Sequence, residues 1–199
     1  MTVAQSNDEN YELPPLEQQS LEEDMADQAS LMYDIPNIDQ SRVEAAWLEM
    51  VNSARSKVWS ELYTLDDGLI KTSIERSQTL ASEKRFSTMH KRPGQKCSSS
   101  RCYDYDTMVK WFADRNITTP IFTESIGYWS YKCWWDDCTD ALIKATKKTF
   151  SFFMSEAKSN GPHYRSVVSS KYSKVWFWIA LTKHPKRGQQ YILVMHVSN

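Results

Sequence analysis

Long hydrophobic runs are missing from this chain of 199 residues. The longest apolar stretch extends only from Val175 to Leu181, whereas a helix needs roughly 20 apolar residues to cross a bilayer. The N-terminus is polar and acidic, unlike a secretory leader, in which a charged start precedes an apolar core. We therefore expect no transmembrane segment and an intracellular protein of the nucleus or the cytoplasm.

Glycine is also scarce, and so are the motifs of catalysis. The chain has five glycines, and each stands alone at a predicted turn, so none belongs to a glycine-rich loop that cradles phosphate. The sequence contains neither a Gly-x-Ser-x-Gly nucleophile elbow nor a His-Glu-x-x-His metal helix. These absences predict that the protein is not an enzyme.

Lysine and arginine are absent from residues 1–41, which hold ten acidic residues. The rest of the chain carries all 24 bases against 15 acids, a formal net charge of +9, although the whole chain has a net charge of −1. Residues 1–40 also contain three prolines and too little apolar surface to offset the entropy lost on folding. We predict a disordered acidic arm over residues 1–40 and a basic, tryptophan-rich domain over residues 41–199.

Apolar residues are interleaved with the acids of the arm, as in segments that fold on a partner. The arm would then recruit a protein partner or act as a transcriptional activation segment. A solubilising tail is the simpler interpretation.

Helical periodicity marks the start of the domain. Ser41 begins a capping box, and apolar residues keep helical spacing from Val43 to about Tyr63, including Val58 and Leu62. A second amphipathic segment follows Gly68, so we expect the two helices to form an antiparallel pair.

Strand signals dominate the remainder, with helices predicted over 106–115 and 137–160. Residues rich in β-branched and aromatic side chains predict strands over 117–122, 126–135, 164–169, 174–182 and 190–197. The last two strands flank a short loop with proline and glycine and should form a hairpin. The expected fold is α+β: an N-terminal helical pair, then a mostly antiparallel sheet of four or five strands with a helix packed on one face.

The last third of the chain combines bases with aromatic rings. Residues 157–199 hold seven bases and no acid, and the loop over residues 84–101 is also basic and free of acids. Nucleic acids need positive charge for their phosphates and flat rings for their bases. An aromatic core with solvated lysines around it is the alternative. The predicted phosphate contacts are Lys91, Arg92, Lys171, Lys174, Lys186 and Arg187.

The four cysteines form two pairs of equal spacing, Cys97 with Cys102 and Cys133 with Cys138. Two such pairs could supply the four ligands of one structural zinc ion, although knuckles usually have shorter spacing. Ordinary reduced thiols are the other interpretation, because intracellular cysteines rarely form disulfides.

Together these patterns favour a non-enzymatic regulatory protein whose basic domain binds DNA or RNA. The alternative is an assembly or adaptor protein that docks on another protein or on an anionic membrane surface. An exposed tryptophan would serve either function.

Overall fold

A computed structural model describes residues 37–82, 90–92, 95, 104–118, 122–134, 137–184 and 188–199. The chain divides into two units, Met1–Ile35 and Pro36–Asn199, and the fold is that of the second unit. The predicted arm over residues 1–40 thus falls almost wholly outside the described residues, as does most of the basic loop over 84–101.

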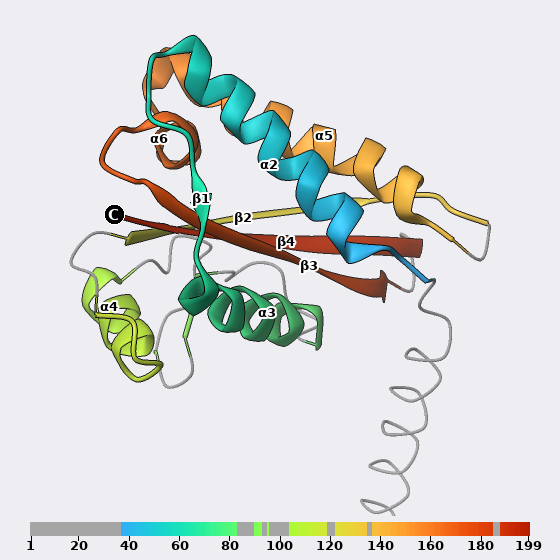
Figure 1. The fold of residues 1–199 in the computed structure, drawn as a ribbon. Helices are drawn as coiled ribbons and strands as arrows, with labels where there is room; N and C mark the ends of the chain where they lie inside the picture. The colour runs from blue at the N-terminus through green and yellow to red at the C-terminus, as the bar shows by residue number, and fades with distance from the viewer. Residues whose placement is uncertain are drawn as a thin grey trace, which may run out of the picture. The chain divides into compact units, whose positions relative to one another are not determined.

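Four strands form one mixed sheet in the order β1-β3-β4-β2 (Figure 1). Strands β3 (Lys174–His184) and β4 (Gly188–Ser198) form the predicted hairpin, and β2 (Phe122–Ser130) runs antiparallel to β4 at the edge. The short strand β1 (Thr64–Leu65) pairs with β3 in parallel. The α+β class is therefore confirmed, with four strands.

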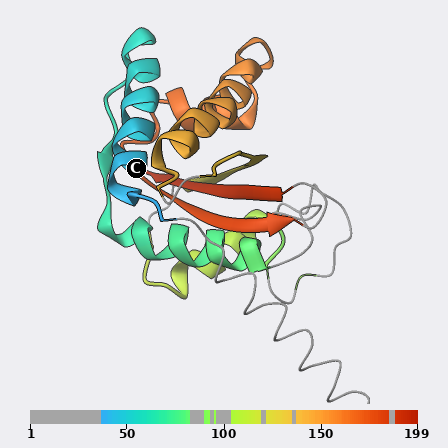
Figure 2. The same ribbon diagram turned by 90° about the vertical axis from the view of Figure 1, so that its right-hand side faces the viewer.

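Helices cover both faces of this sheet rather than one. Helices α2 (Gln40–Lys57), α5 (Thr139–Ser155) and α6 (Pro162–Val168) lie on one face (Figure 1), with the short 3₁₀ helix η2 (Glu156–Ser159) between α5 and α6. Helices α3 (Asp67–Ser82) and α4 (Tyr105–Ala113) lie on the other (Figure 2). Helices α2 and α3 are thus separated by the sheet and do not form the expected antiparallel pair.

The hydrophobic core has one part on each side of the sheet. On the α2 side, the Trp47 ring packs edge-on against Phe153 and tilts against Phe177, with centroids 6.0 Å and 5.7 Å away. On the α4 side, Phe112 and Phe122 have centroids 4.5 Å apart. Strand β3 supplies side chains to both, which accounts for its continuous apolar run.

Residues 162–168 form helix α6 and not the strand predicted over 164–169. Asn160 adopts a left-handed conformation, Gly161 is the N-cap of α6, and Pro162 takes the first turn, where a missing N–H costs nothing. The turn that ends one helix therefore starts the next, and this outweighs the strand preference of Val167 and Val168.

None of the helices in the described part of the chain is long and apolar enough to cross a bilayer. This agrees with the absence of long apolar runs in the sequence.

Candidate functional site

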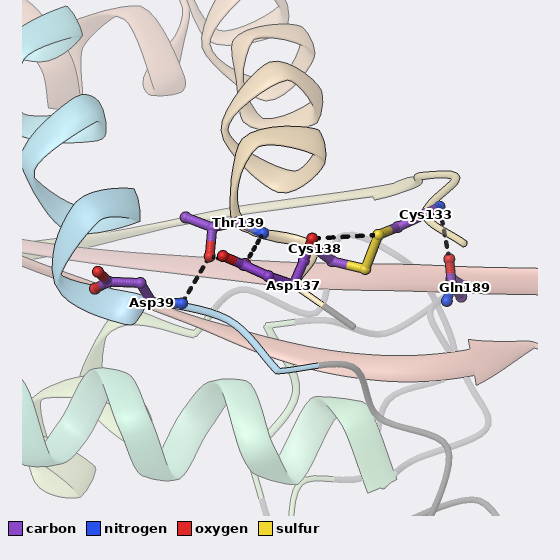
Figure 3. The surroundings of a disulfide bond; sticks show 6 residues. All are labelled: Asp39, Cys133, Asp137, Cys138, Thr139 and Gln189. Atoms are coloured by element: carbon purple, nitrogen blue, oxygen red, sulfur yellow. Dashed lines mark hydrogen bonds between the residues drawn. A yellow bond between two sulfur atoms is a disulfide. The ribbon is translucent and has the colours of Figure 1, made fainter. Parts of the chain in front are cut away.

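Two of the four predicted zinc ligands are joined to each other. Cys133 and Cys138 form a disulfide, with Cα atoms 5.7 Å apart (Figure 3). Their sulfurs are therefore bonded together, contrary to both the zinc and the reduced-thiol interpretations of this pair. Cys97 and Cys102 lie outside the described residues. Within the described ranges, no group of three or more His, Cys, Asp or Glu side chains is placed to hold a metal ion.

The disulfide stands at the start of α5, in a network that also holds the start of α2. Asp137 Oδ1 accepts hydrogen bonds from the backbone N–H and the hydroxyl of Thr139, at 2.8 Å and 2.6 Å. The Thr139 hydroxyl oxygen in turn accepts from the N–H of Asp39 at 2.7 Å, and Cys138 N–H donates to Asn37 C=O. These bonds connect the disulfide loop to the segment that leads into α2 (Figure 3).

Among the predicted phosphate contacts that the structure describes, the arginine is buried and the lysines are more exposed. Arg92 is only 3% exposed and bonds a buried carboxylate, so it does not belong to a phosphate-binding surface. Lys91 is half-buried beside it. Lys171 and Lys174 are exposed, and the Lys174 amine lies 3.8 Å from Asp66. Lys186 and Arg187 lie outside the described residues.

The carboxylate that binds Arg92 belongs to Glu124 on β2. Arg92 Nη1 and Nη2 donate to its two oxygens, at 3.2 Å and 2.7 Å. His90 Nδ1 lies 2.9 Å from Oε1, and His196 Nε2 lies 3.0 Å from Oε2. Arg76 Nε is 3.8 Å from Oε2. We call these five residues the Glu124 cluster.

Electrostatics keep Glu124 ionised although its side chain is buried. Burial alone would raise its pKa, but Arg92, the hydrogen bonds from His196 and His90, and Arg76 hold the pKa well below the usual value. Burial lowers the pKa of His196, and Glu124 only partly opposes this, so its imidazole is neutral. The cluster joins α3, β2, β4 and the segment 90–92 by ion pairs and hydrogen bonds in the interior.

A different feature stands out on the surface: Trp59, whose side chain is 96% exposed. Helix α2 ends in a Schellman motif, in which Ser60 N–H donates to Arg55 C=O and Trp59 N–H donates to Ser56 C=O. Trp59 occupies the left-handed position of this motif, with φ 59°. Glycine or asparagine usually takes that position, because a Cβ atom is strained there.

Arg55 lies beneath this turn and fixes its course. Its fully buried guanidinium donates to the carbonyls of Glu61, Val167, Ser169 and Tyr172. These acceptors come from the connection after α2, from the C-terminal end of α6 and from the loop before β3. One side chain thus holds three backbone segments together.

Further hydrogen bonds hold the same connection against α6 and α2. The Ser60 hydroxyl donates to Val168 C=O at 2.6 Å, and the Tyr63 hydroxyl donates to Ser166 C=O at 2.6 Å. Asn52 pairs with the Tyr63 backbone through both its side-chain atoms. Burial raises the pKa of Tyr63 despite the opposing effect of Arg55, so the phenol remains a donor.

Residues 58–65, which we call the Trp59 loop, expose apolar side chains although their backbone is fixed. Bases flank them, since Lys57 ends α2 and Lys171 lies in the loop held by Arg55, and both are exposed. The exposed apolar residues of the loop are Val58, Trp59, Leu62 and Leu65.

Sequence periodicity missed this loop because it extended the first helix to Tyr63. That extension put Val58 and Leu62 on the buried face, whereas α2 ends at Lys57 and both residues are exposed. Glu124 was missed for another reason, since it falls in the gap between two predicted strands, which β2 spans in the structure. The only sequence feature that indicated a buried acid here was the position of Glu124 among β-branched and aromatic residues.

No family model matches this chain, and no curated protein matches it. Among solved structures, the fold is similar to that of an outer surface protein from Borrelia burgdorferi, with a TM-score of 0.53. The match covers 83% of this chain and 99% of that one at 11% sequence identity. An identity this low shows a shared fold and nothing about function.

Proposed function

We propose that this protein is a non-enzymatic adaptor that docks on a lipid bilayer through the Trp59 loop. The observation that carries the proposal is the position of Trp59, which is almost fully exposed and in a left-handed conformation. A left-handed backbone costs an L-residue with a Cβ roughly 1–2 kcal/mol. The folded chain gains no buried apolar area from this side chain in return.

Two other turns of the same chain use the residue that suits this conformation. Asn116 and Asn160 are the other non-glycine residues with positive φ in the described part of the chain, and each follows a helix. Asparagine tolerates this backbone better than tryptophan does. Tryptophan at position 59 therefore supports a role outside the fold itself.

The chemistry of the loop suits the interface between lipid tails and headgroups. Tryptophan concentrates in that layer because its ring is apolar and its N–H is polar, and neighbouring lysines attract anionic headgroups. Val58 and Leu62 add aliphatic surface next to Trp59, while Lys57 and Lys171 supply positive charge that exceeds the charge of the exposed loop acid, Glu61. Because hydrogen bonds already fix the loop backbone, docking would lose little conformational entropy.

Nucleic-acid binding by the basic domain remains a prediction with less support. Of the described candidates, Lys171 and Lys174 are exposed, whereas Arg92 is committed to Glu124. Binding to a nucleic acid is recognised by an affinity that falls steeply as the salt concentration rises. Binding carried by an apolar loop should depend on salt only weakly.

Sedimentation with lipid vesicles tests the proposal. The full chain is mixed with phosphatidylcholine vesicles, or with vesicles that also contain phosphatidylserine, and compared with the variant Trp59→Asn. Trp134→Asn is the matched control, because Trp134 is 86% exposed but has an ordinary backbone conformation and lies in the disulfide loop. Duplex DNA and single-stranded RNA are tested in parallel over a salt series.

We expect the wild-type chain to bind both kinds of vesicle. The Trp59 ring is buried only when the loop enters the bilayer. Its loss should weaken vesicle binding by about 10- to 100-fold, because burying a large apolar side chain contributes about 1.5–3 kcal/mol. Trp134→Asn should bind like wild type. Equal binding by all three proteins, or binding to nucleic acid alone, would refute the proposal.

A further inference from the structure

We propose that the Glu124 cluster is an acid-sensitive latch, which fastens the segment 90–92 and helix α4 to one face of the sheet and releases them when His196 gains a proton. The device is independent of the Trp59 loop and involves the opposite face of the sheet. It rests on the contacts of one buried carboxylate.

The latch has a single anion at its centre. Glu124 is the only acid in contact with two arginines, Arg76 and Arg92, and with two histidines, His90 and His196, among the described residues. With His196 neutral, the buried guanidinium charges of Arg76 and Arg92 outnumber the buried carboxylate, although the exposed Glu75 also interacts with both of them. A proton on His196 would add a third cation around one anion.

Segment 90–92 is attached to the domain through this centre. Arg92 and His90 bond Glu124, and Arg76 Nη2 donates to the carbonyl of Lys91 at 2.9 Å. The Arg92 guanidinium also lies 4.5 Å above the ring of Trp111 in α4. The segment and α4 therefore share the same anchor.

His196 sits where the opening of α4 would admit water. Its side chain is fully buried, with its ring centroid 4.8 Å from that of Phe112 and 6.1 Å from that of Trp111. Nε2 must carry the hydrogen, because the Glu124 carboxylate can only accept. Nδ1 then accepts from the hydroxyl of Thr72 or Ser73 on α3, at 2.9 Å or 3.2 Å.

Burial opposes the protonation of His196 in the closed state, Glu124 favours it, and the two arginines oppose it. Arg76 faces it from α3 and Arg92 faces it from the segment 90–92, while α4 presents uncharged rings. Beyond those rings, Arg115 pairs with Glu75 of α3 and covers the outer side of Trp111. The open state hydrates His196 and takes up the proton readily, so acid favours opening.

The latch is tested by hydrogen exchange of the full chain, measured by mass spectrometry. The two conditions, about pH 7.5 and about pH 5, lie on either side of the pKa of a free histidine. Exchange rates are corrected for the intrinsic effect of pH. We expect peptides with Lys91, Arg92 and α4 to lose protection by up to about 30-fold at the lower pH, since about pH 5 lies about 1.5 units below the free pKa and each unit shifts such an equilibrium about tenfold. Peptides of the β3–β4 hairpin should remain better protected than those of α4 at both pH values.

Two variants isolate the titrating group. In His196→Gln, the amide can donate to Glu124 but gains no proton, so protection should no longer respond to acid. His163→Gln is the matched control, because His163 also pairs with a glutamate, Glu156, at 2.8 Å but on the other face of the sheet (Figure 1). This variant should respond to acid as wild type does.

The proposal is overturned if wild-type protection is the same at both pH values, if His196→Gln loses protection as wild type does, or if the hairpin opens together with α4. Should His196→Gln fail to fold, the wild-type protein still decides the question. Its His196 ring signals are followed by NMR, and a midpoint that differs from that of the exchange transition also overturns the latch.

Discussion

Gly127 on β2 lies directly against Thr149 on α5, at a distance that leaves no room for a side chain. A Cβ atom added at residue 127 would lie 2.2 Å from Thr149 Cγ2 and 2.9 Å from its Oγ1. Thr149 is itself fixed, because its hydroxyl lies 2.8 Å from the hydroxyl of Tyr191 on β4. The absent side chain therefore sets how closely α5 approaches the sheet.

Gly127→Ala should accordingly destabilise the protein. We expect the free energy of unfolding, measured with urea, to fall by about 1–3 kcal/mol, the usual cost of overpacking a core. Thr149→Ser removes the methyl group that is nearest, so Gly127→Ala should cost less in that background. An equal cost in both backgrounds would show that α5 does not pack on β2 in this way.

Trp59→Asn should stabilise the domain while it abolishes docking. Asparagine relieves the strain of the left-handed turn, and the exposed ring makes no buried contact that would be lost. We expect the free energy of unfolding to rise by about 0.5–1 kcal/mol, part of the roughly 1–2 kcal/mol of strain. Trp134→Asn should change it by less than about 0.5 kcal/mol, as is usual for surface positions. A loss of stability in Trp59→Asn would instead indicate that the ring packs on the domain.

Periodic apolar patterns predicted the elements that have one clear face. The β3–β4 hairpin lies within a few residues of its predicted ranges, and the amphipathic segment predicted after Gly68 lies in α3, which already includes Gly68. The predicted helix over 106–115 is α4. In these elements the apolar pattern and the neighbouring turn residues indicate similar start and end positions. Contacts with distant residues shift those positions by only a few residues.

The candidate sites depend on contacts between residues that are distant in sequence, which no local pattern encodes. Arg55 bonds carbonyls more than a hundred residues away, and this ends α2 before the apolar periodicity does. Arg92 resembles a surface base in the sequence, yet it bonds Glu124 in the interior. Charge counts alone therefore predicted a basic surface where the structure has an ion cluster.

Arg55→Lys should destabilise the protein strongly although it keeps the charge. An ammonium group has three donors on one atom and cannot reach carbonyls on three separate segments, as the planar guanidinium does. At least two carbonyls, buried or part-buried, would lose their partner, and a buried one costs about 1–3 kcal/mol. Urea unfolding measures the loss, and Lys57→Arg, an exchange at an exposed position, is the control. A fully stable Arg55→Lys would mean that the Trp59 loop is held by other contacts.

Acid should lower global stability in two successive steps. The pKa of His196 is lowered by folding, so the unfolded chain takes up its proton first, and stability is full above the free value of 6.5 and declines below it. The pKa of Glu124 is also lowered, so its contribution is full above 4.5 and is lost as the pH falls below that value. Unfolding in urea at a series of pH values should show both declines, and His196→Gln should remove the first alone. A free energy of unfolding that stays constant from neutral pH to below 4.5 would contradict both assignments.

Opening the Cys133–Cys138 disulfide should loosen the start of α2 as well as its own loop. A crosslink that closes a loop of roughly six residues stabilises a protein by about 2 kcal/mol, because it restricts the unfolded chain. The melting temperature of the double variant Cys133→Ser/Cys138→Ser should therefore be about 4–8 °C lower than that of wild type. The Cys138 N–H bond to Asn37 and the Thr139 bond to Asp39 depend on the position of this loop. Amides around residue 39 should therefore exchange faster in the double variant, whereas those of β3 should not change.

A chemical reductant should reproduce this pattern in wild type and have no further effect on the 133–138 loop of the variant. If the amides near residue 39 exchange as in wild type while the melting temperature falls, the disulfide stabilises only its own loop and the link to α2 is refuted.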